Sequence, residues 1–229
     1  MERLIIIPAR KGSKGLPNKN KLLLGGIPLI QWSIDHALRE FPECHLVVST
    51  DDLEIIDLCK IRNVNYIHRS DALSSDSSMM IDVLSDALSF YEKLTGLSFE
   101  LVILLQPTYP FRTREDALRL KELMVDSDFD NIISVVRVND AHPARMYKII
   151  DNNLYNLNDE YSFLNRQDLP SVYLRNGAYY TFRSRLIRDG VLYGRLLVPY
   201  LMGGDNKVNI DAPLDYLLAK LIYEESTKS

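Results

Sequence analysis

Cysteine, histidine and tryptophan are scarce in this sequence. Its 229 residues include two Cys, four His and one Trp. Cys44 and Cys59 are too few for a disulfide scaffold and do not form a CxxC pair, so a reducing cytoplasm is the expected location. No two histidines have the spacing of a metal-binding pair. These shortages exclude a disulfide-rich secreted protein and a histidine-based metal centre.

Long apolar runs are also missing. None approaches the roughly 20 residues that a helix needs to cross a bilayer. The apolar stretch Leu4–Ile7 is short and has no small-residue cleavage site after it, so the N-terminus does not resemble a signal peptide. We therefore expect no membrane partner.

Positive charge is in deficit over the chain as a whole. The formal net charge is -4, which argues against a broad footprint for nucleic acid. The hydrophobic fraction of 46% is too high for a disordered chain. Since a domain commonly has roughly 100–200 residues, we expect a single domain over residues 1–229.

Short apolar runs alternate with amphipathic segments. Leucine-rich and β-branched runs predict buried strands at Leu4–Ile7, Leu46–Ser49, Leu101–Leu105 and Ile132–Val136. Amphipathic patterns predict helices over 28–40, 52–60, 79–94 and 113–125. The expected start signals are Pro28 in a first turn, Asp51 as an N-cap, and a capping box between Thr113 and Asp116. Strand–helix alternation predicts an α/β fold with a mostly parallel, doubly wound sheet.

The pattern changes after Asn139. Residues 140–175 are rich in polar residues, Tyr and Pro, with short strands expected at Met146–Ile150 and Leu154–Leu157. This composition predicts an inserted hairpin or arm instead of another strand–helix unit. Strands then return at Ala178–Phe182 and Leu196–Leu201, and a last helix runs from Pro213 to about Glu225.

The loop after the first strand is the most informative stretch. Its sequence, PARKGSKGLPNKNK, has glycines for tight turns and close backbone approach, and the window from Arg10 to Lys21 has five cations and no acid. The rest of the chain therefore carries -9. A cationic, glycine-bearing loop at the carboxyl end of a strand suits phosphate groups, although the loop matches neither Walker A nor GxGxxG. A solvated basic turn is the alternative, and the position after the first buried strand favours phosphate binding.

The same loop resembles the signature of the CMP-sialic acid synthetases, the acylneuraminate cytidylyltransferases. Further stretches occur in the order found in that family, namely 48–51 (VSTD), 104–112 (LLQPTYPFR), 166–170 (RQDLP), 176–180 (NGAYY) and 209–211 (NID). The resemblance implies a nucleotide-diphospho-sugar transferase-like fold. It also implies CTP and a nine-carbon sugar acid (a nonulosonic acid) as partners, Mg²⁺ as cofactor, and a homodimer.

Residues for the nucleotide follow from the resemblance. It implies that Arg10, Ser13, Lys14 and Lys19 bind the triphosphate, that Asn20 holds the nucleoside, and that Lys14 and Arg10 are catalytic. Arg69 matches an arginine near the cytosine. The segment 72–80 departs from the family pattern, and Ser77 or Ser78 could replace the usual serines; Ser78 is the expected nucleotide contact. For Met79 and Met80 a place in the helix core is the simpler interpretation.

Residues for the sugar acid follow in the same way. The resemblance implies sugar-binding roles for Gln106, Asn176 and Tyr180. It also implies sugar-binding roles for Arg145 and Arg166, which it places in a dimerisation arm that reaches the partner's site and meets the carboxylate of the sugar acid there. Side chains near Tyr179, Tyr180 and 193–198 are expected to select the sugar acid. For Arg112 a phosphate or sugar contact and a salt bridge at a helix start stay open.

The metal ligands expected from the resemblance are Asp211 and Asn209. The family often has a second carboxylate where this chain has Asn209, and an amide oxygen can also bind a hard cation. Asp211 is also the expected catalytic carboxylate, whereas Asp215 is expected to be structural. The general base stays open.

Two other functions stay open. One is a cytidylyltransferase for the eight-carbon acid Kdo, which the 106–108 and 166–170 stretches disfavour. The other is a regulatory protein that binds CTP without turning it over, an idea prompted by Asn209 and the two methionines.

Overall fold

The protein is described here from a computed structural model, which describes residues 2–12, 15–75, 77–126, 128–138, 141–203 and 208–228. Within these residues the largest sheet has seven strands in the order β11-β7-β10-β6-β1-β4-β5. Its strands are β1 (Arg3–Pro8), β4 (His45–Thr50), β5 (Asn65–His68), β6 (Leu101–Leu104), β7 (Asn131–Arg137), β10 (Tyr173–Arg183) and β11 (Leu197–Leu201). All neighbouring pairs are parallel except those of β10, which runs antiparallel to β6 and β7. The expected α/β class and mostly parallel sheet are confirmed.

Helices cover both faces of this sheet, as the alternating side chains of β1 require. Ile5 and Ile7 pack with α1 (Leu29–Glu40), α2 (Leu53–Ile61) and α5 (Arg114–Asp126). Leu4 and Ile6 face the other way, into a core with α4 (Met80–Thr95) and the short α6 (Ser184–Arg188). Burial on both faces explains the continuous apolar runs of the central strands.

All four expected helices begin one residue later than expected, and for two of them the start signal differs as well. Pro28 is the residue before α1 and pairs with Leu23 in a small hairpin of β2 (Leu23–Leu24) and β3 (Ile27–Pro28). Asp52, and not Asp51, caps α2 by accepting a 3.0 Å hydrogen bond from the Glu54 amide. The Asp51 carboxylate instead accepts a 2.6 Å hydrogen bond from the Lys11 amide. A cap in the second position frees Asp51 to hold the cationic loop.

Other local expectations are confirmed. Thr113 and Asp116 form the reciprocal capping box at the start of α5. A short 3-10 turn, η1 (Lys19–Lys21), ends the cationic loop, and α3 (Asp71–Ser74) precedes α4. Strand β5 was not expected, because only Ile67 of its four residues is buried and no apolar run marks it.

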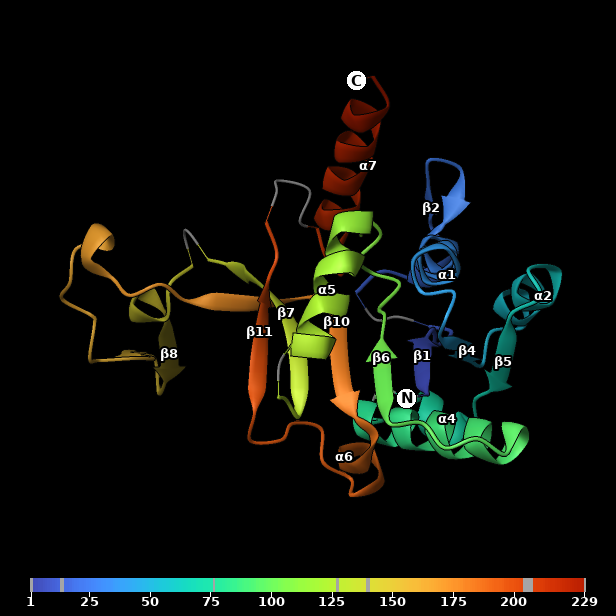
Figure 1. Ribbon diagram of the computed structural model, residues 1–229. Coiled ribbons are helices and arrows are strands. Elements are labelled where there is room, and N and C mark those ends of the chain that lie inside the picture. The colour runs from blue at the N-terminus through green and yellow to red at the C-terminus, as the bar shows by residue number, and fades with distance from the viewer. Residues whose placement is uncertain are drawn as a thin grey trace.

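A hairpin projects from the sheet between β7 and β10, at the left of Figure 1. It consists of β8 (Tyr147–Ile150) and β9 (Asn153–Asn156), flanked by the turns η2 (Pro143–Arg145) and η3 (Arg166–Asp168). The strands expected at 146–150 and 154–157 are thus confirmed, and the role of the segment as a dimerisation arm stays a prediction. We call residues 141–175 the arm.

The C-terminal helix α7 (Pro213–Lys228) lies outside the two main cores. It packs through Ala219 and Tyr223 on the N-terminal segment, where Leu24 and Leu29 complete a third apolar cluster. Among the residues described, no helix is both long enough and apolar enough to cross a membrane.

Candidate functional site

A cleft of about 590 Å³ opens beyond the carboxyl ends of β1 and β6. We call it the polar cleft. The side chains and backbone around it come from five separate parts of the chain: Pro8, Arg10, Gly15, Lys19, Asn20, Arg69, Met80, Gln106, Pro107, Thr108, Asn209 and Asp211. Ligands of open α/β sheets bind at this edge. The cleft therefore brings together seven of the residues expected for nucleotide, sugar acid and metal.

The cationic loop forms one wall of the polar cleft. Buried Asn20 holds the turn by donating a 3.0 Å hydrogen bond from Nδ2 to the carbonyl of Arg10. Gly15 lies directly against Asp211, because a Cβ at position 15 would be 2.6 Å from the Asp211 carbonyl oxygen. Ser13 and Lys14, expected to bind the triphosphate, lie outside the described residues.

Asp211 faces the loop from the opposite wall. Lys19 Nζ is 2.6 Å from its Oδ1, and Asn209 Nδ2 donates to its Oδ2. Asp215 accepts hydrogen bonds from the amides of Asp211 and Ala212, which confirms its structural role at the start of α7. The Asp211 carboxylate stays 60% exposed in spite of these contacts.

This wall offers oxygen ligands of the kind that Mg²⁺ takes. Mg²⁺ commonly binds one or two carboxylates and completes its shell with substrate phosphates and water. Asp211 supplies an exposed carboxylate, and Asn209 has a buried Oδ1 without a hydrogen-bond partner in the described structure. Over the described residues no group of three or more His, Cys, Asp or Glu is arranged so that it could hold a metal ion. The residues present thus fit a cation that relies on its substrate for further ligands.

Arg69 closes the cleft on the side of β4 and β5. It is 4% exposed and donates from Nη2 to the Ser49 carbonyl at 2.8 Å and from Nε to the Ser49 hydroxyl at 3.2 Å. Burial lowers the pKa of its guanidinium to about 10, so it is still charged at neutral pH. A buried cation held by a strand end can present its remaining donors to a ligand.

The segment before α4 differs from expectation. Ser78 does not line the cleft; its hydroxyl bonds to Ser75 Oγ and the Ala72 carbonyl, both at 2.8 Å. Met79 is 62% exposed, so its expected place in the helix core is wrong. Met80 lines the polar cleft and also packs against the core around α4.

Gln106 stands where the polar cleft meets a second cavity of about 340 Å³. We call the second one the apolar cavity. Its lining is Met80, Leu104, Gln106, Leu174, Arg175, Tyr180, Phe182, Leu192 and Tyr193. Gln106 and Met80 belong to both linings, so the two spaces adjoin. Tyr180, expected to bind the sugar acid, lies in the apolar cavity, whereas Tyr179 is fully buried in the core.

At the junction between the two spaces, Gly177 leaves room for the side chains of Gln106 and Asn209. Gly177 has φ +80°, and a Cβ there would be 2.6 Å from Gln106 Oε1 and 3.2 Å from Asn209 Oδ1. The two side chains therefore lie against the bare backbone of β10. Asn176, expected to bind the sugar acid, is buried instead and holds this turn through Ser134 Oγ (2.6 Å) and the Ala178 amide (3.1 Å).

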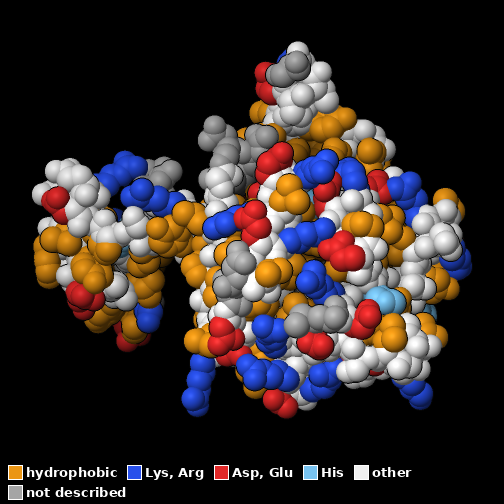
Figure 2. Space-filling view, viewed as in Figure 1, with side chains coloured by type: hydrophobic (Ala, Val, Ile, Leu, Met, Phe, Trp, Pro, Cys, Tyr) orange, Lys and Arg blue, Asp and Glu red, His pale blue; other side chains and the backbone are white. Residues whose placement is uncertain are grey.

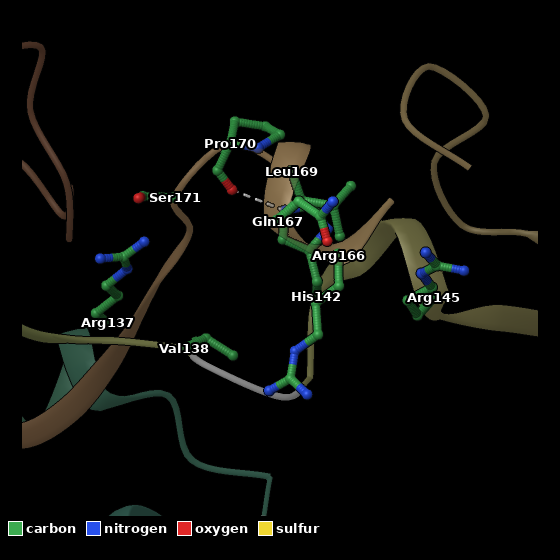
Figure 3. A pocket seen from close by; sticks show the side chains of 9 residues that line it. All are labelled: Arg137, Val138, His142, Arg145, Arg166, Gln167, Leu169, Pro170 and Ser171. Atoms are coloured by element: carbon green, nitrogen blue, oxygen red, sulfur yellow. Dashed lines mark hydrogen bonds between the residues drawn. The ribbon is translucent and has the colours of Figure 1, made fainter. Parts of the chain in front are cut away.

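Arg145 and Arg166 line a third cavity, of about 620 Å³, in the arm (Figure 3). Among the described residues, it shares no lining residue with the polar cleft or the apolar cavity. His142 crosses it, donating from Nε2 to the Pro170 carbonyl at 3.0 Å while its Nδ1 accepts from the Ala144 amide. The two arginines expected to meet the sugar carboxylate are thus on the arm, away from the polar cleft of their own chain.

The comparisons with known proteins show the family and the fold of the chain. A family model described as Cytidylyltransferase matches residues 4–191. The chain belongs to the cytidylyltransferase family. The resemblance to the CMP-sialic acid synthetases is confirmed by an N-acylneuraminate cytidylyltransferase of Streptococcus agalactiae serotype V, which is 31% identical over 95% of this chain. The match covers 52% of that relative, so the chain spans about half the length of the first curated relatives.

A relative of similar length has another name. A CMP-N,N'-diacetyllegionaminic acid synthase of Legionella pneumophila is 32% identical over 98% of this chain and 97% of its own. Among solved structures, a CMP:2-keto-3-deoxy-manno-octonic acid synthetase complexed with CTP matches 99% of this chain and all of its own, with a TM-score of 0.70 and 18% identity. At that identity the match shows the fold alone, and it confirms the expected transferase-like architecture.

Sequence reasoning missed several lining residues. Pro107 and Thr108 follow Gln106 and lie in the same turn, so the position of Gln106 was the available signal. Leu192 lines the apolar cavity from a segment without a motif, whereas Arg175 lies directly before the 176–180 stretch, which was the available signal. Only the fold brings these residues together.

Proposed function

We propose that this protein is a CTP-dependent cytidylyltransferase acting on a nonulosonic acid. The anomeric hydroxyl oxygen attacks the α-phosphorus of CTP, its proton is lost, and the bond to the bridging oxygen of the β-phosphate breaks to release pyrophosphate. The single observation that carries the proposal is the junction at Gln106, where a cationic, polar cleft adjoins a smaller apolar cavity. A triphosphate and a second, partly apolar substrate can meet there in line.

The residues of the polar cleft have separate roles in this reaction. Arg10, Lys14 and Lys19 neutralise charge on the triphosphate, and Ser13 adds a hydrogen-bond donor. Lys14 stabilises the charge that develops on the α-phosphate. Asn20 shapes the loop through the Arg10 carbonyl and contacts the nucleoside. Arg69 offers charged donors to the base. Asp211 is the catalytic carboxylate opposite the loop.

We also propose Mg²⁺ as the cofactor, held by Asp211 with Asn209 as a second ligand. The fit rests on the exposed carboxylate and on the unpartnered amide oxygen beside it. When bound, the cation would screen phosphate charge and favour pyrophosphate departure. Lys19 Nζ already contacts Oδ1 of Asp211 at 2.6 Å, so the lysine and a bound cation would share this carboxylate.

The sugar acid is expected to bind across Gln106 into the apolar cavity, with Tyr180 along its side and Asn176 shaping the turn beneath. Leu174, Phe182 and Leu192 suit acyl methyl groups and carbon chains more than hydroxyl groups. An N-acylneuraminate and an N,N'-diacetyllegionaminate are both candidates. The octonic acid Kdo is the alternative substrate, for which the 0.70 TM-score offers support at the level of fold only.

The working form is proposed to be a homodimer in which each arm serves the partner's cleft. The arm leaves large apolar side chains exposed, including Ile149 at 75%, Leu154 at 67% and Phe163 at 82%. Figure 2 shows hydrophobic surface on the arm at the left, apart from the body. A second copy would cover this surface and bring Arg145 and Arg166 to a sugar carboxylate, which an Arg fork suits. Cys44 and Cys59 are both free thiols, which is consistent with the proposed location in a reducing cytoplasm.

Pyrophosphate release tests the proposal. The protein is incubated with CTP, Mg²⁺ and a panel of N-acetylneuraminate, N,N'-diacetyllegionaminate and Kdo, and each component is omitted in turn. We expect release only when CTP, Mg²⁺ and one of the two nine-carbon acids are present together. If Kdo, and neither nine-carbon acid, supports release in the presence of CTP and Mg²⁺, the substrate would be Kdo. Tight CTP binding in calorimetry with no release from any acid would identify a regulatory CTP-binding protein instead.

A further inference from the structure

Arg112 is a buried cation outside the linings of the polar cleft and the apolar cavity. It is 6% exposed, and burial lowers the pKa of its guanidinium to about 10. Its hydrogen bonds all go to neutral oxygens, and its guanidinium lies between the rings of Tyr109 and Tyr179, 5.7 and 5.6 Å from their centroids. Arg112 forms no salt bridge within the described residues, and it lines neither of the two spaces in which substrates are proposed to bind. A buried charge without a carboxylate partner is costly, so its geometry needs another reason.

The bonds of Arg112 join the two backbone segments that form the junction. Nη2 donates to the Gln106 carbonyl at 2.7 Å and Nε donates to the Ala178 carbonyl at 2.8 Å. Nη1 adds the Tyr109 carbonyl at 2.6 Å and the Ser33 hydroxyl at 3.0 Å. One planar group thus fixes both the turn that presents Gln106 and the irregular stretch of β10 around Gly177.

The ladder between β6 and β10 does not extend to these positions, although β10 pairs with β7 on both sides of Gly177. The ladder between β6 and β10 runs from Arg183 opposite Leu101 to Tyr180 opposite Leu104. Gln106 and Gly177 lie beyond its end, in a stretch where the β10 register shifts. Arg112 therefore continues the cross-link from the last ladder pair to the place where Gln106 Oε1 lies against Gly177.

We infer that Arg112 is a positioning residue that fixes Gln106 against Gly177 and thereby acts on sugar-acid binding while leaving CTP binding almost unchanged. The inference rests on the proposed function for its substrate. It does not require Arg112 to touch either substrate. Lysine cannot replace it, because one ammonium group cannot reach four oxygens in a plane.

The test compares Arg112→Lys with Arg183→Lys in the whole protein. Arg183 is a matched control, since it is a partly buried arginine at the other end of β10, bonded to the Phe129 carbonyl at 3.2 Å and lying over the Phe129 ring. For Arg112→Lys we expect KM for the sugar acid to rise about tenfold, because Gln106 is misplaced. KM for CTP should stay within about twofold of the wild-type value. For Arg183→Lys we expect both constants to stay within about twofold of the wild-type values. Equal increases in both constants for Arg112→Lys, or no increase, would overturn the inference.

A double-mutant cycle with Gln106→Ala separates positioning from general destabilisation. If Arg112 acts through Gln106, Arg112→Lys adds little once Gln106 is gone, whereas additive losses contradict the inference. If Arg112→Lys does not fold, Ser33→Ala is the second variant, because it removes one acceptor of the same guanidinium. We expect a smaller rise in KM for the sugar acid in that variant. An unchanged KM for the sugar acid would count against the inference.

Amide hydrogen exchange provides a readout that does not depend on turnover. Loss of the cross-link is expected to speed exchange at Tyr109, Ala178 and Tyr179, whose amides bond within or beside the two turns. Exchange at these amides in Arg112→Lys equal to that of the wild type would overturn the inference. A wild-type protein with no activity on any sugar acid would remove the proposed function while this readout still decides whether Arg112 holds the junction.

Discussion

Lys19 and Asp211 are 192 positions apart in the chain and form an ion pair of 2.6 Å across the polar cleft. One comes from the cationic loop and the other from the segment before α7. The pair joins the two walls at the point where a triphosphate and a cation are proposed to bind. Each proposed ligand would compete for one partner of the pair, since phosphate attracts Lys19 and Mg²⁺ attracts Asp211.

Changing Lys19 to Ala should therefore move two constants in opposite directions. KM for CTP should rise about tenfold or more, because a charged contact to phosphate is lost. The Mg²⁺ concentration for half-maximal rate should fall, because Asp211 no longer has a lysine on its Oδ1. Initial rates over a matrix of CTP and free Mg²⁺ measure both.

Lys21→Ala is the control for this change. Lys21 lies in the same loop but pairs with Asp52 and Glu54 at 3.0 and 2.8 Å and does not line the cleft. Both constants should stay near the wild-type values in that variant. A rise in the Mg²⁺ requirement of Lys19→Ala would refute the competition for Asp211.

Gly177→Ala should disable the junction without unfolding the protein. Positive φ costs an alanine about 1 kcal/mol. Gly190 has φ +70° with nothing within 4 Å of the place a Cβ would occupy, so Gly190→Ala has the same backbone cost without the clash at Gln106. Urea unfolding should give similar losses of stability for the two variants, and pyrophosphate release should fall at least about tenfold in Gly177→Ala alone. Equal activities would show that the contact at Gln106 is unimportant.

The strands of the core were predictable from sequence because burial on both faces leaves continuous apolar runs, as in Leu4–Ile7. The cationic loop was predictable because its glycines and charges are contiguous. The role of Arg112 was not predictable, because the sequence of a motif does not show whether its arginine faces a ligand or a buried carbonyl. Asp51 and Asp52 show a similar limit: either can cap α2, and only the neighbouring Lys11 amide decides which one does.

His36 should make the fold sensitive to mild acid. It is 3% exposed, its Nε2 contacts the Tyr179 hydroxyl at 2.7 Å, and burial lowers its pKa from 6.5 to about 2. Below pH 6.5 the His36 imidazole is protonated in the unfolded chain, whereas in the folded chain it stays neutral down to about pH 2. Stability from this site is thus complete above pH 6.5 and is lost as the pH falls, approaching about 1.4 kcal/mol per pH unit.

His36→Gln should remove this component of the acid sensitivity. Urea midpoints measured between pH 7 and pH 5 give the slope of unfolding free energy against pH for each protein. The wild-type slope should exceed that of the variant, because carboxylates titrate alike in both. Parallel slopes would mean that His36 takes up its proton in the folded state as readily as in the unfolded chain.

The proposed exchange of arms predicts complementation between two inactive chains. Asp211→Asn impairs the cleft of a chain but leaves its arm intact, and Arg166→Ala does the reverse. A heterodimer of the two, isolated with two affinity tags, contains one cleft with an intact Asp211 served by an intact arm. It should recover about half of the wild-type rate, whereas either homodimer should stay far below that level. The control heterodimer pairs a wild-type chain with a chain that has both changes, and it should be nearly inactive, because the intact cleft then receives the damaged arm. The opposite pattern, an active control and an inactive complementing pair, would mean that each arm serves its own chain.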